Sequence, residues 1–232
     1  MAKNYMDEDN NNPKKITGRN IILCEGLDAK LFVLHFLGST KYADLVDLKN
    51  GVREIEIRNF GGNSQLVTHL MTLKSLDGFE NVRSLLIFRD AETNFEKAIS
   101  EIKLALKNNS FPVPNSVCEK IKDKDGFATG FLLFPACSSK LENGTLEDLC
   151  LKILAETNKD EAKDIVERYL DNMKKDGYTE LKQYHKNVLH SYLSAKDKFV
   201  TKKLGEAARD GAFDFKSEEL NSLVKFVGEM IK

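Results

Sequence analysis

The sequence has 232 residues, and its 35 basic and 36 acidic side chains leave a net charge of −1. This length fits one large domain, or a domain with an extension, and can bury a core without disulfides or a structural metal. With 41% hydrophobic residues, the composition excludes a disordered chain, a collagen and a membrane protein. Because the net charge is close to zero, we expect any contact with nucleic acid to come from a local basic patch.

Residues 1–17 are polar and rich in asparagine, and we expect them to form a disordered, dispensable tail. Beyond this tail, short apolar runs alternate with apolar residues at helical spacing. Strands are predicted at 20–25, 53–58, 84–90 and 129–135, and helices at 28–38, 64–76 and 93–107. The segment 115–128 is ambiguous and fits a hairpin arm. This alternation predicts an α/β fold with a mostly parallel sheet of about four strands.

The pattern changes towards the C-terminus. From Leu146 to Lys232 the spacing is helical almost throughout, apart from turns near Gly177 and Gly211. We therefore expect an α/β domain at 18–156, followed at 157–232 by a helical C-terminal extension that packs on it.

The cysteines are sparse and lie far from any zinc-like spacing with histidine. None forms a C-x-x-C pair, and no apolar segment at the start resembles a signal peptide. This usage predicts reduced, buried thiols in a cytoplasmic protein without a membrane partner. The four positions are Cys24, Cys118, Cys137 and Cys150.

Acidic residues follow two of the predicted strands. Glu25 ends the first strand, and Asp90 and Glu92 end the third. Because the carboxyl ends of parallel strands meet at one edge of a sheet, these acids are expected to converge there. Several carboxylates in a small volume favour a hard divalent cation. The alternative is that they are solvated caps and turns, which are also common at strand ends.

The order of these segments resembles the Toprim domain, a family that includes topoisomerases, primases, ribosomal-RNA maturases and OLD-type nucleases. The segments are 22–28 (ILCEGLD), 61–63 (GGN) and 86–92 (LIFRDAE). The Toprim signature is a Glu after the first strand and an Asp-x-Asp after the third. Here the second acid of that pair is Glu92, which keeps the charge but adds a methylene and so departs from the geometry of the Toprim pattern.

A closer resemblance is to small stand-alone Toprim proteins related to the OLD-type nucleases. It is carried by 130–135 (GFLLFP), 144–149 (GTLEDL), 204–208 (LGEAA) and 213–215 (FDF). The resemblance then extends over nearly the whole chain beyond the tail. It implies a three-layer sandwich and a magnesium- or manganese-dependent nuclease that cleaves the phosphodiester bonds of DNA or RNA.

The resemblance also implies a site with one or two metal ions. Glu25, Asp90 and Glu92 would hold the first ion, and Glu147 with Asp28 the second. A pair of ions about 4 Å apart would clamp the attacking and leaving oxygens of a phosphoryl displacement.

Two further residues of the implied site lie in predicted helices. Lys186 resembles the helix-borne lysine that faces the metals of OLD-type nucleases, where it would stabilise charge during catalysis beside Glu25, Asp90 and Glu92. Asp148 is an additional candidate metal ligand. Its alternative role, shared with Glu147, is to cap a helix that begins after Thr145.

The stretch 181–203 has six lysines and one aspartate, with aromatic residues between them. Surfaces that bind a nucleic-acid backbone mix cations and aromatics in this way, although a solvated helix face would show the same pattern. The loop 136–143 contributes one more cation and is either a mobile flap or a long connection. The candidate nucleic-acid contacts are Lys186, Lys196, Lys198, Lys202, Lys203 and Lys140.

A second class of function fits the same residues. Without efficient catalysis, the acidic site would hold a nucleotide or a nucleic-acid end in a module that docks on a separate ATPase, as in phage-defence systems. The sequence has no Walker A motif of its own. A homodimer is a further candidate assembly.

Overall fold

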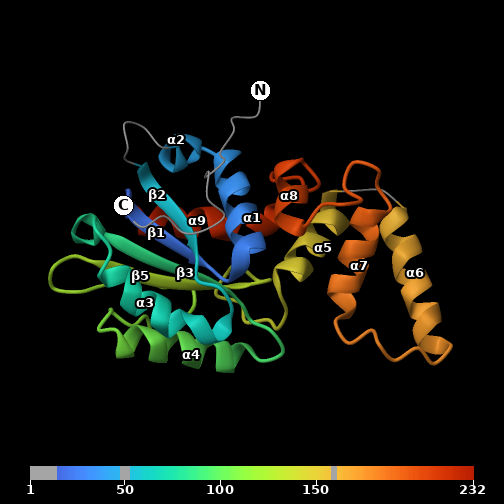
Figure 1. The fold of residues 1–232 in the computed structure, drawn as a ribbon, viewed down its shortest axis with the longest axis horizontal. Helices are drawn as coiled ribbons and strands as arrows, with labels where there is room; N and C mark the ends of the chain where they lie inside the picture. The colour runs from blue at the N-terminus through green and yellow to red at the C-terminus, as the bar shows by residue number, and fades with distance from the viewer. Residues whose placement is uncertain (1–14, 48–52, 158–160) are drawn as a thin grey trace.

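The computed structural model describes residues 15–47, 53–157 and 161–232 (Figure 1). Within them, five strands form one sheet in the order β2–β1–β3–β5–β4. β4 runs antiparallel to β5, and all other neighbouring strands are parallel. The fold is therefore α/β with a mostly parallel sheet, as expected, and the ambiguous segment supplies a short edge strand. The strands are β1 (Gly18–Cys24), β2 (Arg53–Asn59), β3 (Ser84–Asp90), β4 (Ile121–Lys122) and β5 (Ala128–Phe134).

The helices follow the expected order along the chain. They are α1 (Gly26–Gly38), α2 (Ala43–Val46), α3 (Leu66–Lys74), α4 (Phe95–Asn108), α5 (Leu146–Thr157), α6 (Ala162–Lys175), α7 (Tyr184–Ser194), α8 (Leu204–Arg209) and α9 (Asn221–Met230). Of the helices in the described ranges, none has the length and apolar character needed to cross a bilayer.

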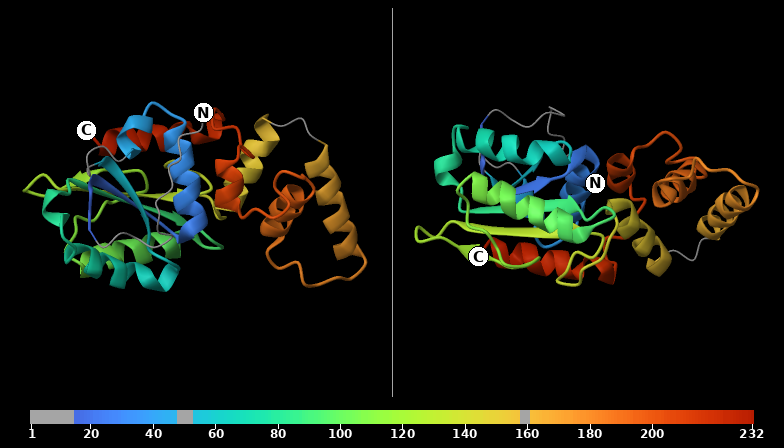
Figure 2. Two further views of the ribbon diagram at one scale, coloured as in Figure 1. Left: turned by 45° about the horizontal axis from the view of Figure 1, so that its top comes forward. Right: turned by 90° about the horizontal axis from the view of Figure 1, so that it is seen from below.

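Helices cover both faces of the sheet (Figure 2), and an apolar core lies on each side of it. Successive residues of β1 alternate between them: Ile22 packs on the side of α1 and α9, and Leu23 on the side of α3 and α4. Both faces of the central strands are buried, which explains why these strands are nearly continuous apolar runs in the sequence. The result is three layers, with helices on both faces of the sheet.

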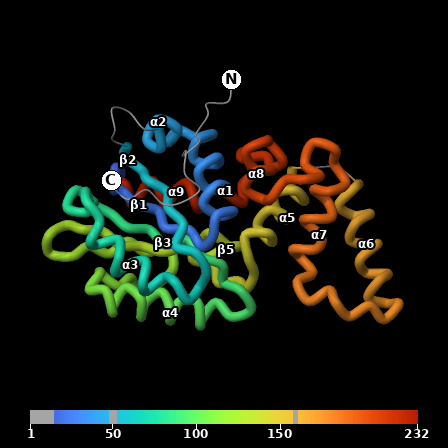
Figure 3. Tube along the Cα trace, in the orientation of Figure 1, coloured from blue at the N-terminus to red at the C-terminus, as the bar shows by residue number. Residues whose placement is uncertain are grey.

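The C-terminal helices divide into two groups (Figure 3). α6 and α7 form a hairpin beyond the sheet, with a small core that contains Val166, Leu170 and Val188. α8 and α9 return to the sandwich. Gly205 of α8 lies so close to α1 that an added Cβ would be 2.6 Å from the Cβ of Leu31, and Gly130 of β5 leaves similar room for α9. The expected extension thus includes two helices that complete the α/β layers.

The fold also uses residues that the sequence analysis assigned to the tail. Ile16 is buried in the core beside α3 and α4. The backbone and hydroxyl of Thr17 both donate hydrogen bonds to Glu56, at 2.6 and 2.9 Å. Residues 1–14, on which the rest of the tail prediction depends, lie outside the described residues.

Glu56 supports this N-terminal region from a fully buried position on β2. Its carboxylate accepts hydrogen bonds from Thr17 and Gly18 and lies 2.6 Å from the Nε of Arg58, which is equally buried. We expect Glu56→Gln to lower the free energy of unfolding by about 2 kcal/mol, because the amide leaves the buried Arg58 charge unpaired. Glu54→Gln on the same strand, which breaks a half-exposed pair with Arg19, should cost no more than about 0.5 kcal/mol. Urea unfolding of both variants checks this; equal losses would contradict it.

Candidate metal centre

Glu25 lies where β1 passes into α1. Its backbone N–H donates to the carbonyl of Phe88 on β3, which holds the two strand ends together. Its carboxylate Oε2 accepts a long hydrogen bond of 3.4 Å from the Asp90 backbone and lies 3.6 Å from the Nε of Arg89. Glu25 therefore points across the carboxyl end of β3.

Asp90 ends β3 beside Glu25. Its Oδ1 accepts a hydrogen bond of 2.9 Å from the backbone of Leu146, which places the first turn of α5 and its Glu147 against the strand end. Burial raises the pKa of Asp90 well above its usual value, and the charges of Glu147 and Glu25 raise it further, against the effect of the Leu146 N–H. Three separate elements thus bring carboxylates to one place.

The pKa of Glu25 is raised as well. Burial raises its pKa, and Glu92 adds to this increase, while Arg89, the Asp90 N–H and Lys186 oppose it. A protein tolerates such an acidic cluster when the carboxyls take up protons or when a cation neutralises them. Oxygen-only donors of this kind suit Mg²⁺ or Mn²⁺.

Glu92 is held in place by its main chain. It has a φ of +56°, which is uncommon for a residue other than glycine, asparagine or aspartate. It exchanges two backbone hydrogen bonds, of 2.8 and 2.7 Å, with Gly144 at the start of the α5 segment. The side chain is exposed, yet its charge raises the pKa of both Glu25 and Asp90. Glu92 therefore borders the cluster from its solvent side.

Lys186 reaches the cluster from α7. Its Nζ lies 3.6 Å from a carboxylate oxygen of Glu147. Partial burial opposes its charge, but Glu147, Asp90 and Glu92 outweigh this effect and raise the pKa of Lys186. The structure thus brings together five of the predicted residues: Glu25, Asp90, Glu92, Glu147 and Lys186.

Asp28 and Asp148, the other predicted ligands, have different partners. Asp28 accepts a hydrogen bond of 2.9 Å from the backbone of Gly205, which attaches α8 to α1. Asp148 accepts bonds from the backbone and hydroxyl of Thr145, as a capping residue does, and its other oxygen is 2.7 Å from the Nδ1 of His185. Both carboxylates serve helix placement in this conformation.

The carboxylates suit a divalent ion in kind, but they are not arranged around one. In the described parts of the chain, no three His, Cys, Asp or Glu side chains are grouped closely enough to hold a metal ion. Two of the carboxylates form ion pairs instead, Glu25 with Arg89 and Glu147 with Lys186. In this conformation both carboxylates are therefore engaged with cations of the protein itself.

The other predicted nucleic-acid contacts lie outside this cluster. Lys198 donates a hydrogen bond to the Asp210 carbonyl, and Lys202 forms an ion pair of 3.4 Å with the Asp210 carboxylate. Lys196 lies over the ring of Tyr192. Lys198 and Lys202 thus hold the end of α8 at Asp210, while Lys203 precedes that helix and Lys140 is exposed in the loop before α5.

The cysteines have the environment expected of inert thiols. In the described chain, which includes all four, each thiol is free; three are buried and Cys118 is half-buried. Burial raises the pKa of every one, to about 12 for Cys118. A thiol with a raised pKa is a poor nucleophile at neutral pH, so none is a candidate for catalysis.

Two residues of the site were missed by sequence reasoning. Arg89 is almost fully buried between Glu25 and Glu101, and His185 pairs with Asp148. The signal for Arg89 was present, since it is the only cation in the apolar run of the third strand. His185 carried no such signal, because its partner lies on another helix.

The molecule is thus an α/β sandwich with carboxylates at one end of its sheet. The chain belongs to the family described as "Protein of unknown function (DUF3226)", whose sequence profile matches residues 19–232. No curated protein and no solved structure matches the chain. The family match includes both the sheet and all helices to α9, so the sandwich and the hairpin are parts of one family unit.

The raised pKa of Asp90 predicts a pH-dependent stability difference. The pKa of Asp90 is higher in the folded state than in the unfolded state. The contribution of Asp90 to stability therefore falls as the pH rises from the unfolded-state pKa through the folded-state pKa, and it stays low at higher pH. Asp90→Asn should therefore be more stable than the wild type at about pH 8, and this advantage should shrink towards about pH 5. Burial lowers the pKa of His35 and of His69 to about 4. Protonation of these two histidines at low pH destabilises the wild type and the variant equally. Melting curves test this; a difference that does not change with pH would contradict it.

Proposed function

We propose that this protein is a divalent-metal-dependent phosphodiesterase that acts on nucleic acid. The observation that carries the proposal is the convergence of Glu25, Asp90 and Glu147 from three elements, with the cation Lys186 beside them. The Toprim resemblance agrees with this arrangement, because it assigns these residues to the same site. Metal-dependent hydrolysis of a phosphodiester uses carboxylates to hold the metal, and a nearby cation adds stabilisation for the charge on the phosphate.

Each residue has a distinct part in the proposed site. Glu25, Asp90, Glu92 and Glu147 would hold Mg²⁺ or Mn²⁺, which supplies positive charge to the phosphate and activates water. Arg89, beneath Glu25, favours the ionised form that a metal needs. Lys186 keeps its proton next to the carboxylates and adds positive charge where a phosphate would gain negative charge.

The proposal is tested by hydrolysis of labelled DNA and RNA oligonucleotides with Mg²⁺ or Mn²⁺. We expect cleavage that stops with EDTA and returns when excess metal is added. Glu96→Gln is a suitable control, because Glu96 is an exposed acid of α4 that lies outside the proposed ligand set. Cleavage that persists in EDTA, or none with any metal and substrate, would reject the proposal.

One observation favours the second candidate, a weakly catalytic binding module. Glu92 stands where the Toprim pattern has aspartate, and its backbone is fixed by the pair of bonds with Gly144. Because the backbone of Glu92 is fixed, its longer side chain would place the carboxylate oxygens farther from the backbone than those of an aspartate at the same position. Glu92→Asp separates the two candidates: increased cleavage would favour the module, whereas reduced cleavage would favour a site adapted to glutamate.

A further inference from the structure

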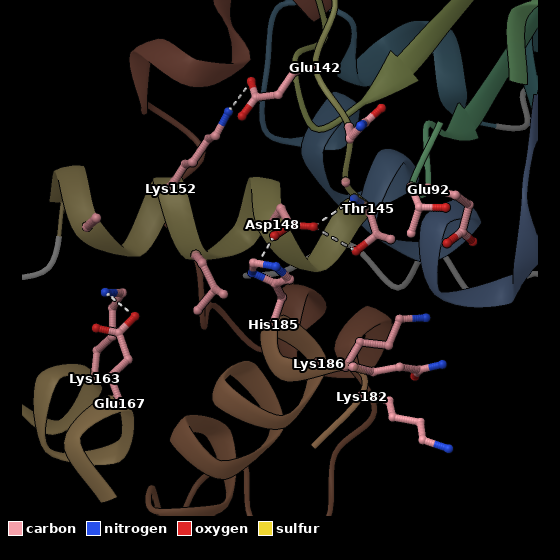
Figure 4. Close-up of a pocket in the computed structure, with 16 residues that line it drawn as sticks. Glu92, Glu142, Thr145, Asp148, Lys152, Lys163, Glu167, Lys182, His185 and Lys186 are labelled. Atoms are coloured by element: carbon pink, nitrogen blue, oxygen red, sulfur yellow. Dashed lines mark hydrogen bonds and ion pairs between the residues drawn. The ribbon is translucent and has the colours of Figure 1, made fainter. Parts of the chain in front are cut away.

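A cleft of about 710 Å³ lies between α5 and the α6–α7 hairpin (Figure 4). Its lining includes Glu92 and Lys186, which also belong to the acidic cluster. The cleft and the cluster are therefore continuous. A ligand with one group at the cluster would place its next group in this cleft.

Two lysines on the walls of the cleft are each paired with a carboxylate. Lys152 forms an ion pair of 2.7 Å with Glu142, and Lys163 forms one of 2.9 Å with Glu167 (Figure 4). Each cation on these walls is thus compensated by its own carboxylate. The interior favours a polar but uncharged group.

One lysine at the side next to the acidic cluster has no carboxylate partner of its own among the described residues. Lys182 precedes α7 and makes no ion pair or hydrogen bond with any other residue that the structure describes. Figure 4 shows the side chain of Lys182 on the same side of the cleft as that of Lys186 but diverging from it, away from Glu92. Lys182 is therefore free to bind an anion just outside the cluster.

The floor of the cleft is apolar. Leu151 and Ala155 lie on the face of α5 turned towards the hairpin, and Ala155 is exposed. The volume falls within the range of sites for small molecules, roughly 300–1,000 Å³. The matching ligand has an anionic group at one end and a flat, uncharged body, which is the chemistry of a nucleotide.

We propose that this cleft binds the nucleotides that flank the reacting phosphate in a single strand of nucleic acid. Their bases lie over Leu151 and Ala155, and a flanking phosphate binds Lys182. The inference rests on the proposed function, which places the reacting phosphate at the acidic cluster. The volume of about 710 Å³ has room for roughly one or two nucleotides and is too small for a duplex. The protein should therefore prefer single strands or frayed ends.

Binding is measured by fluorescence anisotropy with Ca²⁺ in place of Mg²⁺, which removes any dependence on hydrolysis. A labelled single strand should bind at least about tenfold more tightly than the blunt duplex of the same sequence. Ala155→Trp fills the cleft from an exposed helix position and should weaken single-strand binding at least about tenfold. Ser194→Trp, an exposed position on α7 outside the cleft, should bind as the wild type does.

A second pair of variants keeps the test independent of the tryptophan. Lys182→Glu should weaken binding and flatten its dependence on salt, because one phosphate contact is lost. Lys175→Glu, an exposed charge reversal at the far end of α6, should leave affinity within about twofold. Equal affinity for single strand and duplex would overturn the inference. So would a single-strand affinity that neither Ala155→Trp nor Lys182→Glu changes. Cleft-dependent binding by a protein that hydrolyses nothing would support the inference and reject the phosphodiesterase.

Discussion

Asp90→Asn should abolish divalent-metal binding and lower hydrolysis by on the order of 10³-fold or more. Asp90 is the most deeply placed carboxylate of the cluster, and both Glu25 and Glu147 act on its charge. Asparagine keeps an oxygen that can accept the Leu146 N–H but removes the charge that a hard cation requires. The fold should remain intact, because the substitution removes a repelled charge. Mn²⁺ titration calorimetry and oligonucleotide cleavage measure the two effects.

Asp148→Asn is the matched control for this substitution. Asp148 is also an acid of the α5 region, but its oxygens bind Thr145 and His185. We expect this variant to lose about 1 kcal/mol of stability through weaker capping, with metal affinity reduced less than in Asp90→Asn. If Asp148→Asn abolished Mn²⁺ binding while Asp90→Asn retained it, the assignment of the centre would be wrong.

Lys186→Met should lower turnover by roughly 10²–10³-fold and change nucleic-acid affinity little. Lys186 is the half-buried cation next to Glu147, and its charge faces the cluster that would hold the reacting phosphate. A charge that acts mainly on the transition state affects kcat more than binding. The measurements are single-turnover cleavage with Mg²⁺ and oligonucleotide affinity with Ca²⁺.

Two comparisons make the Lys186 result specific. Lys175→Met removes an exposed lysine from the same hairpin and should behave as the wild type. Lys186→Arg retains the charge and should recover part of the turnover. A loss of affinity equal to the loss of turnover would show that Lys186 only anchors the strand.

The sheet could be predicted from the sequence because its central strands are buried on both faces. Runs such as 85–88 are apolar throughout and are followed by charged residues, so the ends of these strands were visible in the sequence. The positions of Glu25 and Asp90 followed from the parallel sheet. The prediction was less complete for β4, whose two residues carry almost no pattern.

Contacts between distant helices could not be predicted. Asp28 binds the backbone of Gly205, 177 residues later, and nothing in either segment indicates the other. The cleft has the same origin, because α5, α6 and α7 are each ordinary amphipathic helices. Their packing around Val166, Leu170 and Val188, together with the burial of Leu189 and Leu193 in the main core, sets the hairpin beside the acidic cluster. Spacing along one helix carries no information on which partner it meets.

The central claim is that this acidic cluster is a metal centre, and crystals soaked with Mn²⁺ test it most directly. The account predicts an anomalous peak about 2–2.3 Å from carboxylate oxygens of Glu25 and Asp90, with Glu25 rotated away from Arg89. An absence of any peak at saturating Mn²⁺, with Glu25 still beside Arg89 and Glu147 still beside Lys186, would contradict it.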